Sequence, residues 1–129
     1  MILETTFVID FLKGRADAVS KMESLIKEGA LLSITTPTVF ELFAGYAQYG
    51  KGEEEKQKMI SFLKSVTLFP LDEEGAREGG IIDGTLIKKG LEIDTEDSMI
   101  AGIAKTNNET LLTRDQHFDR IEGLKVEKY

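Results

Sequence analysis

Four acidic residues in separate segments of the chain have types and positions that could carry chemistry. Glu4 and Asp115 each follow a short apolar run, and Glu41 and Asp97 lie in the first turns of predicted helices. Four carboxylates packed together repel one another, which raises their pKa values, so they stay anionic only beside a cation. The sequence therefore predicts a cation site wherever the fold brings these acids together.

The available ligand types indicate which cation this would be. Carboxylate oxygens favour Mg²⁺ or Mn²⁺, whereas zinc sites use cysteine and histidine. The chain has no cysteine and one histidine, so we expect no zinc site and give His117 a surface or turn role. One or two such ions can orient a water and stabilise phosphodiester oxyanions, so hydrolysis of a nucleic-acid backbone is the corresponding reaction.

Ordinary structural roles also account for these acids. Asp97 can complete a capping arrangement with Asp94 at the positive end of a helix, and Glu41 can form a capping box with Thr38. Asp115 can cap the turn that follows it. The residues alone leave both interpretations open.

The elements that must position the acids follow from the alternation of short apolar runs with amphipathic segments. Strands are predicted at residues 1–3, 31–34, 66–71, 110–113 and 124–127, the last at a sheet edge. Helices are predicted at residues 7–12, 18–26, 36–49, 53–63, 72–89 and 95–104. This order predicts an α/β domain with a mainly parallel sheet, whose ligands bind outside the carboxyl ends of the strands.

Local details of these helices can also be predicted. A hydroxyl of Thr5 or Thr6 is expected to cap the first helix, Thr36 the third and Asp72 the fifth. The second helix should present an inward apolar stripe, made of Ala18, Val19, Met22, Leu25 and Ile26. Gly79, Gly80 and Gly84 are expected to interrupt or loosen the fifth helix, through close packing or a bend.

Composition limits the class of protein. The 129 residues, 41% of them hydrophobic, are expected to form one domain over residues 1–129, with a core that needs no disulfide. No apolar run is long enough to cross a bilayer, and we expect a cytoplasmic protein with no membrane partner. The net charge of −7 argues against a surface built for non-specific attraction to nucleic acid, but it is compatible with an acidic metal pocket.

Two predicted helices carry more apolar surface than a small sheet can cover. The residues concerned are Phe40, Phe43, Tyr46 and Tyr49, and then Met59, Ile60, Phe62 and Leu63. Core packing is one interpretation of these stripes. The other is that part of this surface forms a homodimer or receives an amphipathic segment of a partner in a groove.

The chain also resembles a known family through ordered motifs at residues 1–12, 41–45, 97–101, 113–115 and 117–126. Their order and spacing are similar to those of PIN-domain ribonucleases, in particular the VapC-type toxins, over essentially the whole chain. The resemblance implies a three-layer α/β/α fold and a Mg²⁺- or Mn²⁺-dependent endoribonuclease. It also implies a homodimer that a VapB-type antitoxin inhibits.

The resemblance assigns roles to individual residues. It implies that the catalytic and metal-binding carboxylates are Glu4, Glu41, Asp97 and Asp115, with Thr6 and Thr113 in supporting positions and Asp119 as a further candidate. The family normally has aspartate where this chain has Glu4. Asp10 is no substitute, because it falls inside the following helix rather than at the strand end.

Basic residues that could contact RNA phosphates are Lys13, Arg15 and Arg114, with Lys51 and Arg120 as further possibilities, although scattered exposed cations are often merely solvated. Two alternatives to the enzyme remain. One is a PIN-like module that binds RNA or protein without hydrolysis. The other is a receiver-like phosphotransfer domain, which the unpaired Glu4 and the helix-capping position of Asp72 disfavour.

Overall fold

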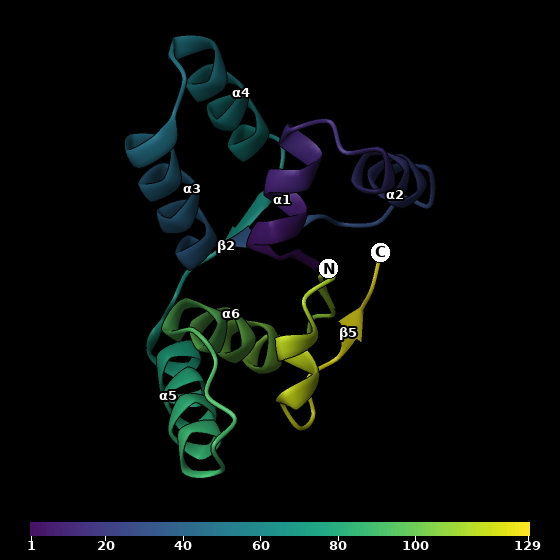
Figure 1. Ribbon diagram of the computed structural model, residues 1–129. Helices are drawn as coiled ribbons and strands as arrows, with labels where there is room; N and C mark the ends of the chain where they lie inside the picture. The colour runs from purple at the N-terminus through teal and green to yellow at the C-terminus, as the bar shows by residue number, and fades with distance from the viewer.

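The computed structural model describes residues 1–129 as strands alternating with helices (Figure 1). The strands are β1 (Ile2–Leu3), β2 (Ser33–Thr35), β3 (Thr67–Phe69), β4 (Leu111–Leu112) and β5 (Val126–Glu127). The helices are α1 (Thr5–Leu12), α2 (Ala16–Lys27), α3 (Thr36–Tyr49), α4 (Glu53–Lys64), α5 (Glu73–Lys88), α6 (Thr95–Thr106) and the short 3₁₀ helix η1 (Gln116–Arg120). None of the helices combines the length and apolar character needed to cross a membrane.

The five strands form one parallel sheet in the order β3-β2-β1-β4-β5. From β1 the chain builds outward through β2 and β3 on one side, and then returns to add β4 and β5 on the other. The order therefore reverses between β1 and β4, which is where open α/β sheets leave a crevice at the carboxyl ends of their strands. Glu4 follows β1, and Asp115 follows β4, so both flank this crevice.

The sheet separates two apolar clusters. Because successive strand residues point to opposite faces, Ile2 and Leu111 pack on one side while Leu3 and Leu112 pack on the other. The first cluster joins the sheet to α5, α6 and η1, and the second joins it to α1–α4. Figure 1 shows α5 and α6 below the sheet and α1–α4 above it. The predicted three-layer fold is confirmed.

The contact between α5 and α6 depends on two glycines. A Cβ atom on Gly102 would lie 2.5 Å from the backbone nitrogen of Gly79, and a Cβ on Gly79 would lie 3.0 Å from the carbonyl oxygen of Ser98. The predicted close packing is confirmed. The predicted interruption of the helix is wrong, since α5 continues from Glu73 to Lys88. This contact holds the start of α6, which carries Asp97, against α5.

Several local predictions are corrected by the structure. The cap of α1 is Glu4, whose side chain accepts from the Thr6 N–H, rather than a threonine hydroxyl. The cap of α3 is Thr35, one residue earlier than predicted, and the Thr36 hydroxyl instead accepts from the Leu71 N–H. The prediction of Asp72 as the cap of α5 is confirmed.

The apolar stripe of α2 is narrower than predicted. Ala18, Met22 and Leu25 are buried at spacings of four and three residues, whereas Ile26 is 64% exposed because it lies one step further round the helix. Strand β2 begins at Ser33, and this leaves Leu31 exposed before it.

Candidate metal and active site

Glu4 is a buried carboxylate at the centre of the crevice, with 2% of its surface exposed. Its Oε2 accepts from the Thr113 hydroxyl at 3.0 Å and from the Thr6 N–H at 3.1 Å. Burial raises the pKa of Glu4 to about 7, although the hydrogen bonds from Thr113 and Thr6 act in the opposite direction. Both of these bonds reach the same oxygen, Oε2.

Asp97 lies in the first turn of α6 and is 7% exposed, yet no protein hydrogen bond reaches its carboxylate. Burial and, after it, the negative charges of Glu4, Glu41 and Asp115 raise the pKa of Asp97 to about 8. The fold thus brings all four acids close enough to affect one another. The capping interpretation fails here, because Asp94 makes no side-chain cap bond.

Glu41 is tied to α1 rather than to its own helix. Its Oε1 accepts from the Thr5 hydroxyl at 2.7 Å, and the Thr5 oxygen lies 2.9 Å from the Thr38 hydroxyl. Since Thr5 has one hydroxyl proton and gives it to Glu41, Thr38 donates in the second bond. The capping box with Thr38 is therefore absent. Burial raises the pKa of Glu41, and Glu96 adds to this effect.

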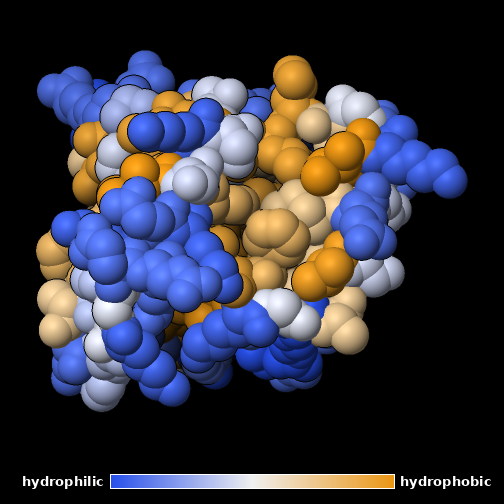
Figure 2. Space-filling view, turned by 90° about the horizontal axis from the view of Figure 1, so that it is seen from above, coloured by the Kyte–Doolittle hydropathy of each residue, from blue (hydrophilic) through white to orange (hydrophobic).

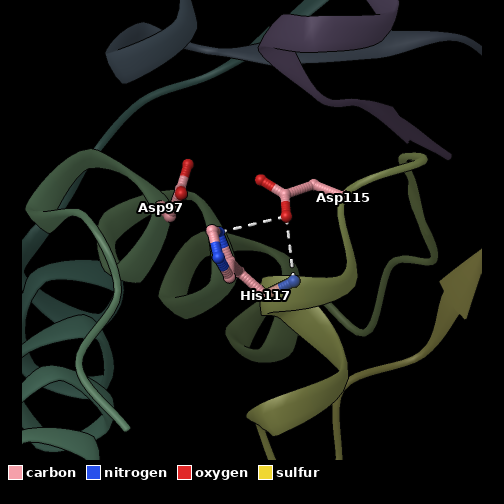
Figure 3. A group of neighbouring side chains, drawn as sticks. All are labelled: Asp97, Asp115 and His117. Atoms are coloured by element: carbon pink, nitrogen blue, oxygen red, sulfur yellow. Dashed lines mark hydrogen bonds and ion pairs between the residues drawn. The ribbon is translucent and has the colours of Figure 1, made fainter.

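Asp115 is the cap of η1, as predicted, and it faces Asp97 across the crevice. Its Oδ1 accepts from the His117 N–H at 2.9 Å, and the His117 Nδ1 lies 3.1 Å from the same oxygen. One ligand atom from each of Asp97, Asp115 and His117 falls within 4.8 Å of the others (Figure 3). His117 lies in the turn η1, as expected, but its ring also lies beside Asp97 and Asp115, which the sequence did not indicate.

Thr113 connects two of the acids. Its buried hydroxyl donates to Glu4 and accepts from the Asp115 N–H at 3.0 Å. A single side chain on the β4 exit thus orients the carboxylate on β1 and the turn that carries Asp115. Asp119 does not join them, since it is exposed and forms an ion pair with Lys128 at 3.1 Å.

The basic residues predicted to contact RNA have different environments. Arg114 donates to the Asp10 carboxylate at 2.8 Å, and Arg15 pairs with Asp17 at 2.9 Å and with Asp10 at 3.7 Å. Carboxylates therefore offset both arginine charges. Lys13 lines a separate groove that also contains Glu41.

Two polar groups near the site were not found from the sequence. Thr5 was considered only as a helix cap, yet its hydroxyl holds Glu41. The Tyr129 hydroxyl donates to Asp10 at 2.6 Å, and its ring packs edge-on against Phe7 with centroids 4.8 Å apart. Asp10 and Tyr129 are 119 positions apart in the sequence, and no pattern in the sequence indicated that they meet.

The donor chemistry fits a hard divalent cation. Carboxylate oxygens dominate the crevice, and the pKa values of Glu4 and Asp97 are raised first by burial and then by the neighbouring negative charges, with no positive charge to offset either effect. A divalent ion beside them would favour the charged carboxylates and lower both pKa values. The third strand ends without a phosphoacceptor, because the Asp72 carboxylate caps α5, so the receiver-like alternative is not supported.

A parallel sheet with an acidic crevice at its switch point is the arrangement expected of a PIN domain, and comparison with known families agrees. The PIN-domain family matches residues 1–124, and the chain belongs to that family. Among individual proteins, it is similar to the tRNA(fMet)-specific endonuclease VapC of Salmonella typhimurium, with 24% identity over 99% of this chain and 96% of the relative. It is 28% identical to Ribonuclease VapC19 of Mycobacterium tuberculosis over 95% of each chain.

Solved structures show the same likeness. VapBC2 from Rickettsia felis, solved bound to a DNA fragment from their promoter, superposes with a TM-score of 0.88 at 26% identity, over 99% of this chain and 97% of that one. FitAcB from Neisseria gonorrhoeae gives a TM-score of 0.76 at 26% identity, over 97% and 94% of the two chains. The predicted resemblance to PIN-domain ribonucleases is confirmed.

Proposed function

We propose that this protein is a divalent-metal-dependent endoribonuclease, the toxin of a toxin–antitoxin pair, and that residues 1–129 act as one PIN-like domain in the cytoplasm, where its RNA substrate lies. The observation that carries the proposal is the convergence of Glu4, Glu41, Asp97 and Asp115 on one crevice. The ribonuclease names of the VapC relatives support it.

Glu4, Asp97 and Asp115 would hold Mg²⁺ or Mn²⁺, with Glu41 beside them. When bound, such an ion lowers the pKa of a water and stabilises negative charge on phosphate oxygens. Thr113 keeps Glu4 and the Asp115 turn in fixed orientations. Thr5 occupies Oε1 of Glu41, so Oε2 is left to accept a proton from the attacking water as the phosphodiester bond breaks.

The proposed partners are an identical subunit and a VapB-type antitoxin segment. A groove of about 820 Å³ runs between α1, α3 and α4 and reaches Glu41, with apolar lining from Ile9, Leu42, Tyr46, Tyr49 and Met59. Phe40 and Tyr49 are 66% and 74% exposed on α3, whereas Met59 and Phe62 of α4 face the core. Figure 2 shows apolar side chains gathered in a hollowed area of one face, with hydrophilic residues around it. An amphipathic helix suits such a groove.

The test is cleavage of a single-stranded RNA oligonucleotide by a nuclease-free preparation. The wild type should be inactive in EDTA and regain activity with Mn²⁺ or Mg²⁺, and Asp97→Asn should stay inactive with either. Asp17→Asn is the matched control, because this exposed aspartate pairs with Arg15 away from the crevice. A wild type that binds RNA and Mn²⁺ without cutting would favour the non-hydrolytic binding module.

A further inference from the structure

A second cavity, of about 560 Å³, adjoins the acidic crevice. Its lining is entirely polar and comprises Thr6, Arg114, Asp115, Gln116, His117 and Arg120. Asp115 belongs to both the cavity and the candidate metal site, so the two sites adjoin at this residue. A polymer bound at the metal site would extend into this cavity or away from it.

Arg120 supplies this cavity with a fixed positive charge. One of its terminal nitrogens donates to the carbonyl oxygens of Glu92 at 3.1 Å and Leu91 at 3.3 Å, in the loop before α6. No carboxylate lies within ion-pair distance of the guanidinium. The carbonyls therefore orient the side chain without neutralising it, and its other two nitrogens remain free to donate.

The neighbouring cations are neutralised. Arg114, which lines the same cavity, donates to the Asp10 carboxylate, and Lys128 pairs with Asp119. Arg15 is shared between Asp10 and Asp17. Arg120 differs from these three residues because its guanidinium is oriented by uncharged carbonyl groups and forms no ion pair.

We propose that this cavity binds a backbone phosphate of single-stranded RNA, next to the phosphate that is cleaved, and that Arg120 is its main ligand. The inference rests on the proposed function, and it names a substrate subsite of the same centre. A guanidinium with free donors matches phosphate oxygens, and an arginine is needed here because the adjacent carboxylates repel the polyanion. The Gln116 amide, in the same lining, is a second donor for the phosphate.

The test compares Arg120→Gln with Arg120→Lys and with Arg77→Gln. Arg77 is an exposed arginine on α5 without an ion pair, so its substitution changes the net charge by the same amount. Arg120→Gln should raise KM for a single-stranded RNA oligonucleotide about tenfold with kcat changed less than about twofold, and should reduce the salt slope of binding by about 0.7. Arg120→Lys should recover part of the loss, and Arg77→Gln should match the wild type.

A purely structural role for Arg120 predicts a different pattern. Releasing the loop at Leu91 and Glu92 would move the start of α6, so Mn²⁺ affinity measured by calorimetry would fall while the salt slope stayed constant. That pattern overturns the proposal, as does an unchanged KM. The same comparison in an Asp97→Asn background, with RNA affinity measured by fluorescence anisotropy, separates this proposal from the proposed function. If Asp97→Asn and the variant that also carries Arg120→Gln bind RNA with equal affinity, the proposed subsite is wrong, whether or not the wild type cuts RNA.

Discussion

Asp10 and Asp97 are aspartates of nearly equal burial, with 8% and 7% of their surfaces exposed, yet their pKa values shift in opposite directions. Burial by itself raises the pKa of both. Around Asp10 the hydrogen bonds from Arg114 and Tyr129 outweigh burial and lower the pKa, whereas around Asp97 burial and, after it, the other carboxylates raise the pKa to about 8. The carboxylate of Asp10 pairs with the arginines Arg114 and Arg15, whereas no cationic side chain pairs with Asp97. Whether neighbouring groups offset burial or add to it therefore distinguishes this structural acid from a candidate metal ligand.

The largest expected effect is on catalysis. Asp97→Asn should lower metal-dependent RNA cleavage about a hundredfold or more, because it removes an anionic ligand with little change in shape. Asp10→Asn should retain most of the activity, since Asp10 bonds to Arg114 and Tyr129 and is not one of the four converging acids. Single-turnover cleavage with Mn²⁺ measures both, and equal losses would show that the two aspartates do not differ in role.

Stability without metal should fall as pH rises. The pKa of Asp97 is about 8 in the folded protein against an ordinary 3.8, so above about pH 4 the unfolded chain releases a proton that the folded protein keeps. The stability that the retained proton gives is fully present below about pH 4 and is lost as pH rises through about 8, by on the order of 6 kcal/mol. Glu4 acts in the same direction up to about pH 7.

Urea unfolding of wild type and Asp97→Asn in EDTA, from pH 4.5 to 8.5, measures this contribution by difference. The variant should show a shallower decline with pH, and Mn²⁺ should stabilise the wild type most at the alkaline end. Parallel curves for the two proteins in EDTA would contradict the expected proton uptake.

Breaking the bonds between Asp10 and its partners should affect folding stability more than chemistry. Asp10→Ala leaves the guanidinium of Arg114 without its carboxylate and should cost about 2 kcal/mol. Tyr129→Phe keeps the ring contact with Phe7 and should cost about 1 kcal/mol. The contribution of Asp10 to folding stability depends on pH with the opposite sign from that of Asp97. Because the pKa of Asp10 is lowered in the folded protein, its contribution is lost as pH falls. Chemical denaturation at pH 7 checks the two costs.

The smallest effect is expected at Glu4. Glutamate places its carboxylate about 1.3 to 1.5 Å further out than aspartate, and Mg²⁺ tolerates such displacement poorly. We expect weak Mg²⁺ binding, better activity with Mn²⁺, and a gain of a few-fold for Glu4→Asp. Calorimetry and cleavage rates on both forms decide the matter, and a joint fall in affinity and rate would show that glutamate is the adapted ligand.

Much of the fold could be predicted because it depends on local patterns. Apolar runs marked all five strands, and the parallel order followed from their alternation with helices. The convergence of Glu4, Glu41, Asp97 and Asp115 followed from the rule that parallel strands end at the same edge. These inferences need only sequence periodicity and topology.

The remaining features depend on contacts between distant segments. The bond from Thr5 to Glu41 joins two helices, and the Asp10 cluster joins α1 to Arg114 and Tyr129. Neither pair has a characteristic spacing, so the sequence could not indicate them. The pairing of Arg15 and Arg114 with carboxylates was hidden for the same reason, as was the free charge of Arg120.

The bridge made by Thr113 also bears on how the protein is synthesised. This hydroxyl joins Glu4 to the Asp115 turn across 109 positions, and β1 completes its pairing only when β4 lies beside it. A ribosome releases the amino-terminal segment first, at about 5 to 20 residues per second. A nascent chain therefore carries Glu4 and Glu41 for several seconds before the segment with Thr113 and Asp115 emerges. The proposed nuclease centre is thus incomplete throughout most of translation.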